Sequence, residues 1–144
     1  MSLVKKNSLH SLLPAFMLLL VTTMIADSQG DDNLGTKVMV EVNNSLPGDA
    51  SFNIHCKSKD DDLGIHIIGV YQNYKFKFKV NFWATTLFFC GIRWQGGGVT
   101  FDIYYAKRDL NRCPHHCLWL VREVGVMGFQ QDKPTPDIII PWDN

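Results

Sequence analysis

The side chains in this chain best suited to chemistry lie in one short cluster, the segment CPHHC at residues 113–117. Thiolate and imidazole groups are the ligands that zinc takes in tetrahedral sites, so this spacing could hold a metal ion. Structural zinc sites usually pair two such clusters, whereas the remaining cysteines, Cys56 and Cys90, each stand alone. We therefore predict no metal site and no cofactor.

Three consecutive carboxylates, Asp60, Asp61 and Asp62, form a second candidate for metal chemistry in the polar segment 57–64. A calcium-binding EF-hand loop places its oxygen ligands at alternate positions and ends on a glutamate, a pattern that these residues do not match. Aspartates in turns also accept hydrogen bonds from nearby backbone N–H groups, which needs no metal. The segment is therefore predicted to be a solvated turn.

Catalytic motifs are missing from the sequence, which has neither a G-x-S-x-G nucleophile elbow nor an H-E-x-x-H zinc helix. A catalytic site is defined by convergent groups, and the histidines are scattered along the chain. We therefore predict no catalytic residues and a protein that is not an enzyme. The alternative is a secreted hydrolase or metal-dependent enzyme that uses His115 and His116.

The N-terminus decides how the cysteines are interpreted. Lys5 and Lys6 precede an uncharged, mostly apolar run over 12–25, and small residues follow at Ala26 and Ser28. This order is typical of a secretory signal peptide, which we place at residues 1–28. The run is shorter than the about 20 residues of a spanning helix, so we expect a secreted, extracellular protein without membrane insertion in its mature form.

An even number of cysteines in a short secreted chain predicts disulfides rather than metal ligands or a free nucleophile. The four cysteines, Cys56, Cys90, Cys113 and Cys117, allow three pairings. A Cys113–Cys117 bridge would close only a small loop. This disfavours one pairing and leaves two, of which we expect Cys56–Cys117 together with Cys90–Cys113.

Composition indicates one folded domain. The chain has 144 residues, a formal net charge of zero and 46% hydrophobic residues. No basic excess is available to neutralise phosphates, so neither nucleic acid nor an anionic membrane is expected as a partner.

The domain is placed at residues 29–129, and the proline-containing residues 130–144 are expected to form an extended tail whose apolar residues 138–140 could dock on the body or on a partner.

Hydrophobic residues alternate with polar ones at period two through most of the mature chain, which is typical of half-buried strands. The clearest case is residues 74–80, where three lysines face away from the aromatic side chains, as in an exposed or edge strand. Residues 86–94 are nearly continuously apolar and are predicted to be buried on both faces. The fold class is all-β, a small antiparallel β-sandwich of about seven to eight strands stapled by two disulfides. The expected strands cover residues 37–43, 51–56, 65–71, 74–80, 86–94, 99–106, 117–124 and 125–129.

A glycosylation sequon, Asn43-Asn44-Ser45, follows the first expected strand. Its position at a junction between a strand and a loop would leave a glycan in solvent. Asn43 is therefore a predicted glycosylation site.

These segments, taken in order, resemble the plant self-incompatibility protein S1 family over about residues 37–129. The resemblance rests on the segments VMVEVN at 38–43, CKSKDDDLG at 56–64, YKFKF at 74–78, NF at 81–82, TLFFC at 86–90, FDIY at 101–104 and RD at 108–109, followed by Cys113, Cys117 and Trp119. It implies a small secreted plant protein that folds as a β-sandwich with two disulfides. Some members look like pistil-expressed ligands that reject self pollen through a receptor.

The resemblance and the compartment together suggest a ligand or interaction protein that acts in cell–cell signalling through a cell-surface receptor protein. Loops on a rigid scaffold usually carry recognition, so the candidate surfaces are the loops 44–50, 57–64 and 107–116. We single out Asp60, Asp61 and Asp62 as the candidate receptor-binding residues. A carbohydrate-binding module that uses exposed aromatic side chains is a further alternative. The sequence indicates no oligomeric state.

Overall fold

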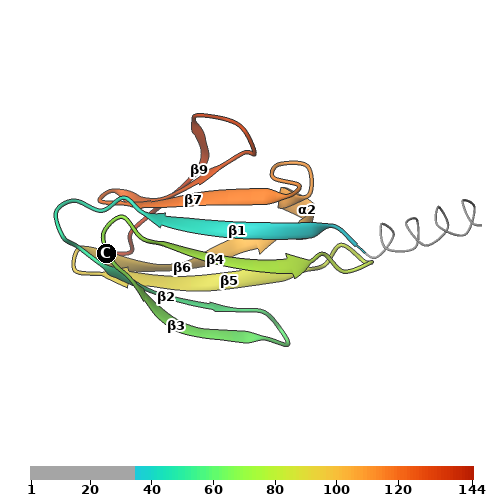
Figure 1. Ribbon diagram of the computed structural model, residues 1–144, viewed down its shortest axis with the longest axis horizontal. Coiled ribbons are helices and arrows are strands. Elements are labelled where there is room, and N and C mark those ends of the chain that lie inside the picture. Colours follow the sequence, from blue (N-terminus) through green and yellow to red (C-terminus); the bar gives the residue numbers. More distant parts are fainter. Residues whose placement is uncertain (1–34) are drawn as a thin grey trace, which may run out of the picture. The chain divides into compact units, whose positions relative to one another are not determined.

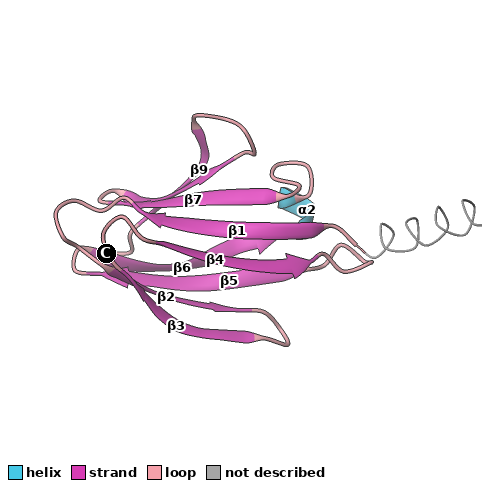
Figure 2. Cartoon of the chain, in the orientation of Figure 1, coloured by secondary structure: helices cyan, strands magenta, loops and turns pink. Residues whose placement is uncertain are grey.

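The structure, a computed structural model, describes residues 35–144, so the expected signal peptide lies outside the described residues. Figures 1 and 2 show two layers of strands in this part of the chain. One sheet has the order β4-β1-β7-β8-β9 and the other the order β3-β2-β5-β6. The five-stranded sheet contains β1 (Lys37–Asn44), β4 (Asn73–Lys79), β7 (His116–Arg122), β8 (Gly125–Phe129) and β9 (Pro136–Pro141). The four-stranded sheet contains β2 (Phe52–Lys57), β3 (Asp62–Ile68), β5 (Leu87–Trp94) and β6 (Gly97–Tyr105).

The predicted all-β sandwich is confirmed, and its strands follow the alternation of the sequence. In β1 the valines Val38, Val40 and Val42 are buried while the residues between them are more exposed. Neighbouring strands pair antiparallel except β1 and β7, which run parallel. The expected edge position of residues 74–80 is also confirmed, because β4 is the outer strand of its sheet and its lysines are exposed.

The prediction that residues 86–94 are buried on both faces is wrong. The side chains of β5 alternate, with Phe88, Cys90 and Ile92 buried and Phe89 and Arg93 exposed. In a two-layer sandwich each sheet has one face against the core and one toward solvent, so a central strand such as β5 is covered on one face only.

The expected boundary at residue 129 is too early, because the last residues form a ninth strand in the described chain. Strand β9 pairs antiparallel with β8, and the compact unit extends from Thr36 to Asn144. Trp142 follows β9, packs near Trp94 with 6.1 Å between ring centroids, and donates its indole N–H to the carbonyl of Glu123 at 2.9 Å. The tail therefore belongs to the domain.

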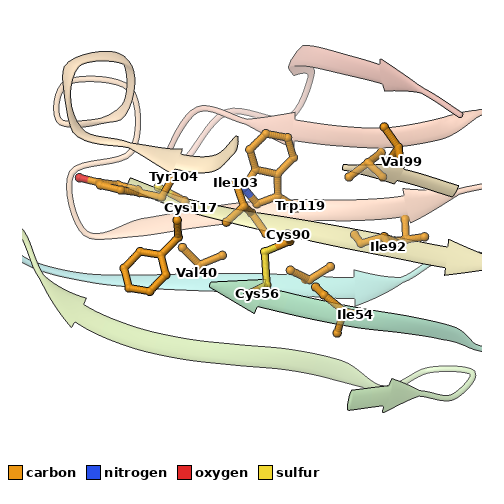
Figure 3. Packing of buried hydrophobic residues seen from close by; sticks show 14 of the residues in the cluster. Val40, Ile54, Cys56, Cys90, Ile92, Val99, Ile103, Tyr104, Cys117 and Trp119 are labelled. Atoms are coloured by element: carbon orange, nitrogen blue, oxygen red, sulfur yellow. A yellow bond between two sulfur atoms is a disulfide. The ribbon is translucent and has the colours of Figure 1, made fainter. Parts of the chain in front are cut away.

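The core lies between the two sheets and is built around large, fully buried side chains (Figure 3). Trp119 of β7 and Tyr104 of β6 are the largest of these, and both have no exposed surface. Phe78 of β4 packs edge-on against Tyr104, with 4.7 Å between ring centroids. Burying a large apolar side chain contributes about 1.5–3 kcal/mol relative to leaving it in water, so this layer is a major source of stability.

Two disulfides are present, as expected, but the expected pairing Cys56–Cys117 with Cys90–Cys113 is wrong. The bridges are Cys56–Cys90 and Cys113–Cys117. Cys56 of β2 lies directly opposite Cys90 of β5, with 4.1 Å between Cα atoms, and Figure 3 shows this bridge in the core. The small loop from Cys113 to Cys117 is also closable, because the chain turns there and brings the two Cα atoms to 5.1 Å.

Candidate binding surface

The candidate receptor-binding aspartates lie in the tight turn between β2 and β3. The turn is ordered by two hydrogen bonds, from Ser58 N–H to the Asp61 carbonyl at 2.8 Å and from Asp61 N–H to the Ser58 hydroxyl oxygen at 3.0 Å. Within residues 35–144 no hydrogen bond or ion pair reaches the carboxylates of Asp60 and Asp61, which are exposed. These two carboxylates therefore project from a rigid hairpin into solvent.

Asp62 has a different role from its two neighbours, because β3 begins at this residue. Its Oδ1 accepts a hydrogen bond from Gly64 N–H at 2.9 Å and lies 2.6 Å from the ring nitrogen Nε2 of His55. Lys57 lies 3.9 Å from the other carboxylate oxygen. The hydrogen bond from Gly64 N–H lowers the pKa of Asp62 most, and the contact with His55 lowers it further. The expected turn chemistry is thus present at Asp62, which positions the hairpin.

His116 is the first residue of β7 and His115 directly precedes it. Cys113 and Cys117 beside them are bonded to each other. His116 Nε2 contacts a carboxylate oxygen of Glu41 on the neighbouring strand at 2.7 Å. The backbone N–H groups of both histidines donate to the Gln131 side-chain oxygen, at 2.9 and 3.0 Å. Within the described part of the chain, no group of three or more His, Cys, Asp or Glu side chains is arranged to hold a metal ion.

The loop expected over residues 107–116 contains a single helical turn, α2 (Ala106–Asp109), which is held by a buried carboxylate. Asp109 has no exposed surface, and its Oδ2 accepts a hydrogen bond from Tyr105 N–H at 2.8 Å. Arg108 donates to both carboxylate oxygens at 2.9 Å, and Arg112 adds a contact at 3.2 Å. Paired in this way, the buried charge fixes α2 against the end of β6.

Arg112 extends this ion-pair network to the C-terminal strand. Its guanidinium forms a two-point contact with Asp137 of β9, at 2.6 and 2.7 Å, and this contact lowers the pKa of Asp137. The guanidinium carbons of Arg108 and Arg112 lie 5.8 and 5.6 Å from the centre of the Trp119 ring. The 107–116 loop is therefore a rigid part of the fold, which leaves little of it free to adapt to a partner.

The first loop, between β1 and β2, is anchored by a buried amide. Asn44 donates to the carbonyls of Ala50 and Ile68, at 2.9 and 3.1 Å, and its side-chain oxygen accepts from Leu46 N–H at 3.0 Å. This side chain therefore ties β1 to the loop before β2 and to the end of β3. The neighbouring Asn43 is half-buried on β1, and its glycosylation stays a prediction.

Sequence reasoning missed the most exposed aromatic pair, Phe82 and Trp83, which lies in the loop between β4 and β5. Their exposed fractions are 89% and 78%. The strand expected over residues 86–94 begins after this pair, and no surface role is predicted for residues 82 and 83. The sequence signal that could have located this exposed loop is its set of polar flanking residues, Asn81, Thr85 and Thr86. In the structure their side chains are joined by hydrogen bonds that close the turn.

No helix in residues 35–144 is both long and apolar enough to span a bilayer.

Two small sheets, two disulfides and short ordered loops define the class of disulfide-stabilised β-sandwich domains, which present loops from a rigid core. The chain belongs to the plant self-incompatibility protein S1 family, whose model matches residues 39–142.

Curated relatives from Arabidopsis thaliana agree with this family. S-protein homolog 5 is 47% identical over 81 residues, a match that covers 56% of this chain and 62% of the relative's own length. S-protein homolog 20 is 37% identical over 110 residues, covering 76% of this chain and 82% of the relative.

One solved structure has the same fold, with a TM-score of 0.60 and 17% identity over 76% of this chain and 97% of the other. It is described as a structure of self-incompatibility protein homologue proteins, "a widespread family of small, highly stable, secreted proteins from plants".

Proposed function

We propose that this protein is a secreted ligand that acts in cell–cell signalling by binding a cell-surface receptor protein through the turn between β2 and β3. The observation that carries the proposal is the pair of carboxylates of Asp60 and Asp61, which are exposed on an ordered hairpin. A rigid turn loses little conformational freedom on binding, which favours recognition. The solved relative's description as secreted supports the extracellular location.

The chemistry of this turn indicates what the receptor surface should contain. Two adjacent carboxylates attract a basic patch, and complementary charge mainly accelerates association and selects among partners. Because Asp62 is engaged with Gly64 and His55, it acts by positioning the turn rather than by contacting the receptor.

The test is saturable binding of the labelled, oxidised mature protein to plant protoplasts. The variant Asp60→Asn/Asp61→Asn keeps the side-chain shape and removes the charge. We expect its affinity to fall by about fivefold or more, mainly through slower association. The matched control, Asp132→Asn/Asp143→Asn, removes two exposed carboxylates outside the turn and should bind like the unmodified protein.

Equal binding by the Asp60/Asp61 variant would refute the assignment of the turn, provided that its circular dichroism and thermal unfolding match the unmodified protein. An equal loss of binding in the control variant would also refute it, because the effect would then follow overall charge.

A further inference from the structure

The loop between β4 and β5, residues 81–86, presents an unusual pair of aromatic side chains. Phe82 and Trp83 are 89% and 78% exposed and stack edge-on, with 5.2 Å between ring centroids and 85° between ring planes. Isolated apolar residues on a surface are ordinary, but two large adjacent rings at a loop tip mark an interaction site. Both side chains extend from the loop into solvent.

The loop that carries these rings is rigid. The Asn81 side chain donates to the Thr85 hydroxyl at 2.8 Å and accepts from Thr85 N–H at 2.9 Å. Asn81 N–H donates to the Thr86 hydroxyl oxygen at 2.8 Å, and Ala84 closes the turn with a φ of 53°. The rings are therefore held outside the core by the loop itself.

Lysines gather beside this loop on the outer face of the five-stranded sheet. Lys37 of β1 is opposite Lys79 of β4 in the sheet register, and Lys79 precedes Phe82 by only three positions. Figure 1 shows the start of β1 and the end of β4 at the same end of the sandwich. An open depression of about 570 Å³ lies here, and no acidic side chain among residues 35–144 lines it. Its lining residues are Lys37, Val38, Met39, Lys77, Phe78, Lys79 and His115.

We infer that Phe82 and Trp83, together with Lys37, Lys77 and Lys79, dock the protein on a lipid bilayer that displays anionic headgroups. Trp and Phe side chains gain free energy at the boundary between headgroups and acyl chains, and nearby lysines are attracted to anionic lipid. A convex aromatic tip bordered by cations fits such a surface. The contact is peripheral and involves no spanning insertion. It departs from the expectation, drawn from the net charge of zero, that an anionic membrane is no partner, because the lysines gather on one face of the sheet.

The inference is tested by co-sedimenting the oxidised mature protein with phosphatidylcholine vesicles, with and without added phosphatidylglycerol. We expect binding to the anionic vesicles and at least about tenfold weaker binding to neutral ones, because each lysine near the surface contributes about fivefold. Binding should weaken as sodium chloride is raised, since salt screens the lysines.

Two variants separate the contributions of the rings and the charges. Phe82→Ser/Trp83→Ser should weaken binding to anionic vesicles by about tenfold or more, because the variant lacks the free energy gained when the aromatic rings move from water into the bilayer. Lys37→Gln/Lys77→Gln/Lys79→Gln should bind anionic and neutral vesicles almost equally. The control Ile65→Ser/Tyr71→Ser removes two exposed apolar side chains of other segments and should keep its affinity within about twofold.

The inference is overturned if the unmodified protein does not bind anionic vesicles, or if the Phe82/Trp83 variant binds as well as the unmodified protein. It is also overturned if the control variant loses binding equally. Because these vesicles contain no protein, the result is independent of the proposed receptor.

Discussion

The disulfide pairing predicts two different stability losses that can be measured side by side. The Cys56–Cys90 bridge joins residues 34 positions apart, whereas the Cys113–Cys117 bridge joins residues 4 positions apart. A bridge stabilises mainly by restricting the unfolded chain, and the loop-entropy relation gives about 4 kcal/mol for the longer loop and about 2 kcal/mol for the shorter one. All four cysteines have no exposed surface, so the packing lost on substitution is similar for the two pairs.

The assay is urea unfolding of Cys56→Ala/Cys90→Ala and Cys113→Ala/Cys117→Ala, with thiol titration of each denatured variant. The first variant should be less stable by about 2 kcal/mol than the second, and neither should contain free thiol. If Cys56 bonded Cys117 and Cys90 bonded Cys113, each variant would leave two unpaired thiols. Free thiol in either variant, or equal stability of the two, would refute the reasoning.

Two further predictions concern the ion pairs around α2. Asp109→Asn should lower the free energy of unfolding by about 3 kcal/mol, because the fully buried carboxylate that pairs with Arg108 and Arg112 is lost and Arg112 keeps only Asp137 as a charged partner. Urea unfolding measures this loss. A loss below about 1 kcal/mol would show that Asp109 contributes little. The hydrogen bond from Arg112 lowers the pKa of Asp137 below its ordinary value of 3.8. The ionised carboxylate therefore contributes its full stability at pH values above 3.8. That contribution is lost as the pH falls through the lower pKa of the folded state. Asp137→Asn should therefore be less stable than the unmodified protein at neutral pH. In thermal unfolding, this difference in stability should shrink below about pH 3.8. A difference that does not change with pH would contradict the pairing of Asp137 with Arg112.

Much of the sandwich could be predicted because its strands alternate locally. Val38, Val40 and Val42 on one face of β1, and lysines opposite aromatic side chains in β4, are patterns within single segments. The ninth strand was missed because Pro136 and Pro141 suggest an extended tail outside the sheets. Prolines are tolerated at strand ends and on edge strands, and β9 is the outer strand of its sheet.

The pairing of the cysteines could not be predicted, because it depends on the register between strands far apart in the sequence. Cys56 meets Cys90 because β2 and β5 are neighbours, which no local pattern reveals. The lysines of β4 can be read from the sequence, but neither their pattern nor a net charge of zero shows that Lys37 joins them. Only the pairing of β1 with β4 brings Lys37 next to Lys79.

The candidate site was predicted in part. The segment 57–64 contains the predicted turn, but the turn covers only residues 58–61, because Lys57 ends β2 and Asp62 begins β3. Only the structure separates the exposed Asp60 and Asp61 from Asp62, which accepts a hydrogen bond from Gly64 and lies against His55. Such roles depend on where β3 begins, and residue types alone do not determine that position.

The central claim is that the protein binds a receptor protein through the turn between β2 and β3. The most direct test measures binding to intact protoplasts and to protoplasts whose surface proteins have been removed by protease. The proposal predicts saturable binding that is lost after protease treatment and weakened by Asp60→Asn/Asp61→Asn. Saturable binding that survives protease treatment, or the absence of saturable binding, would contradict it.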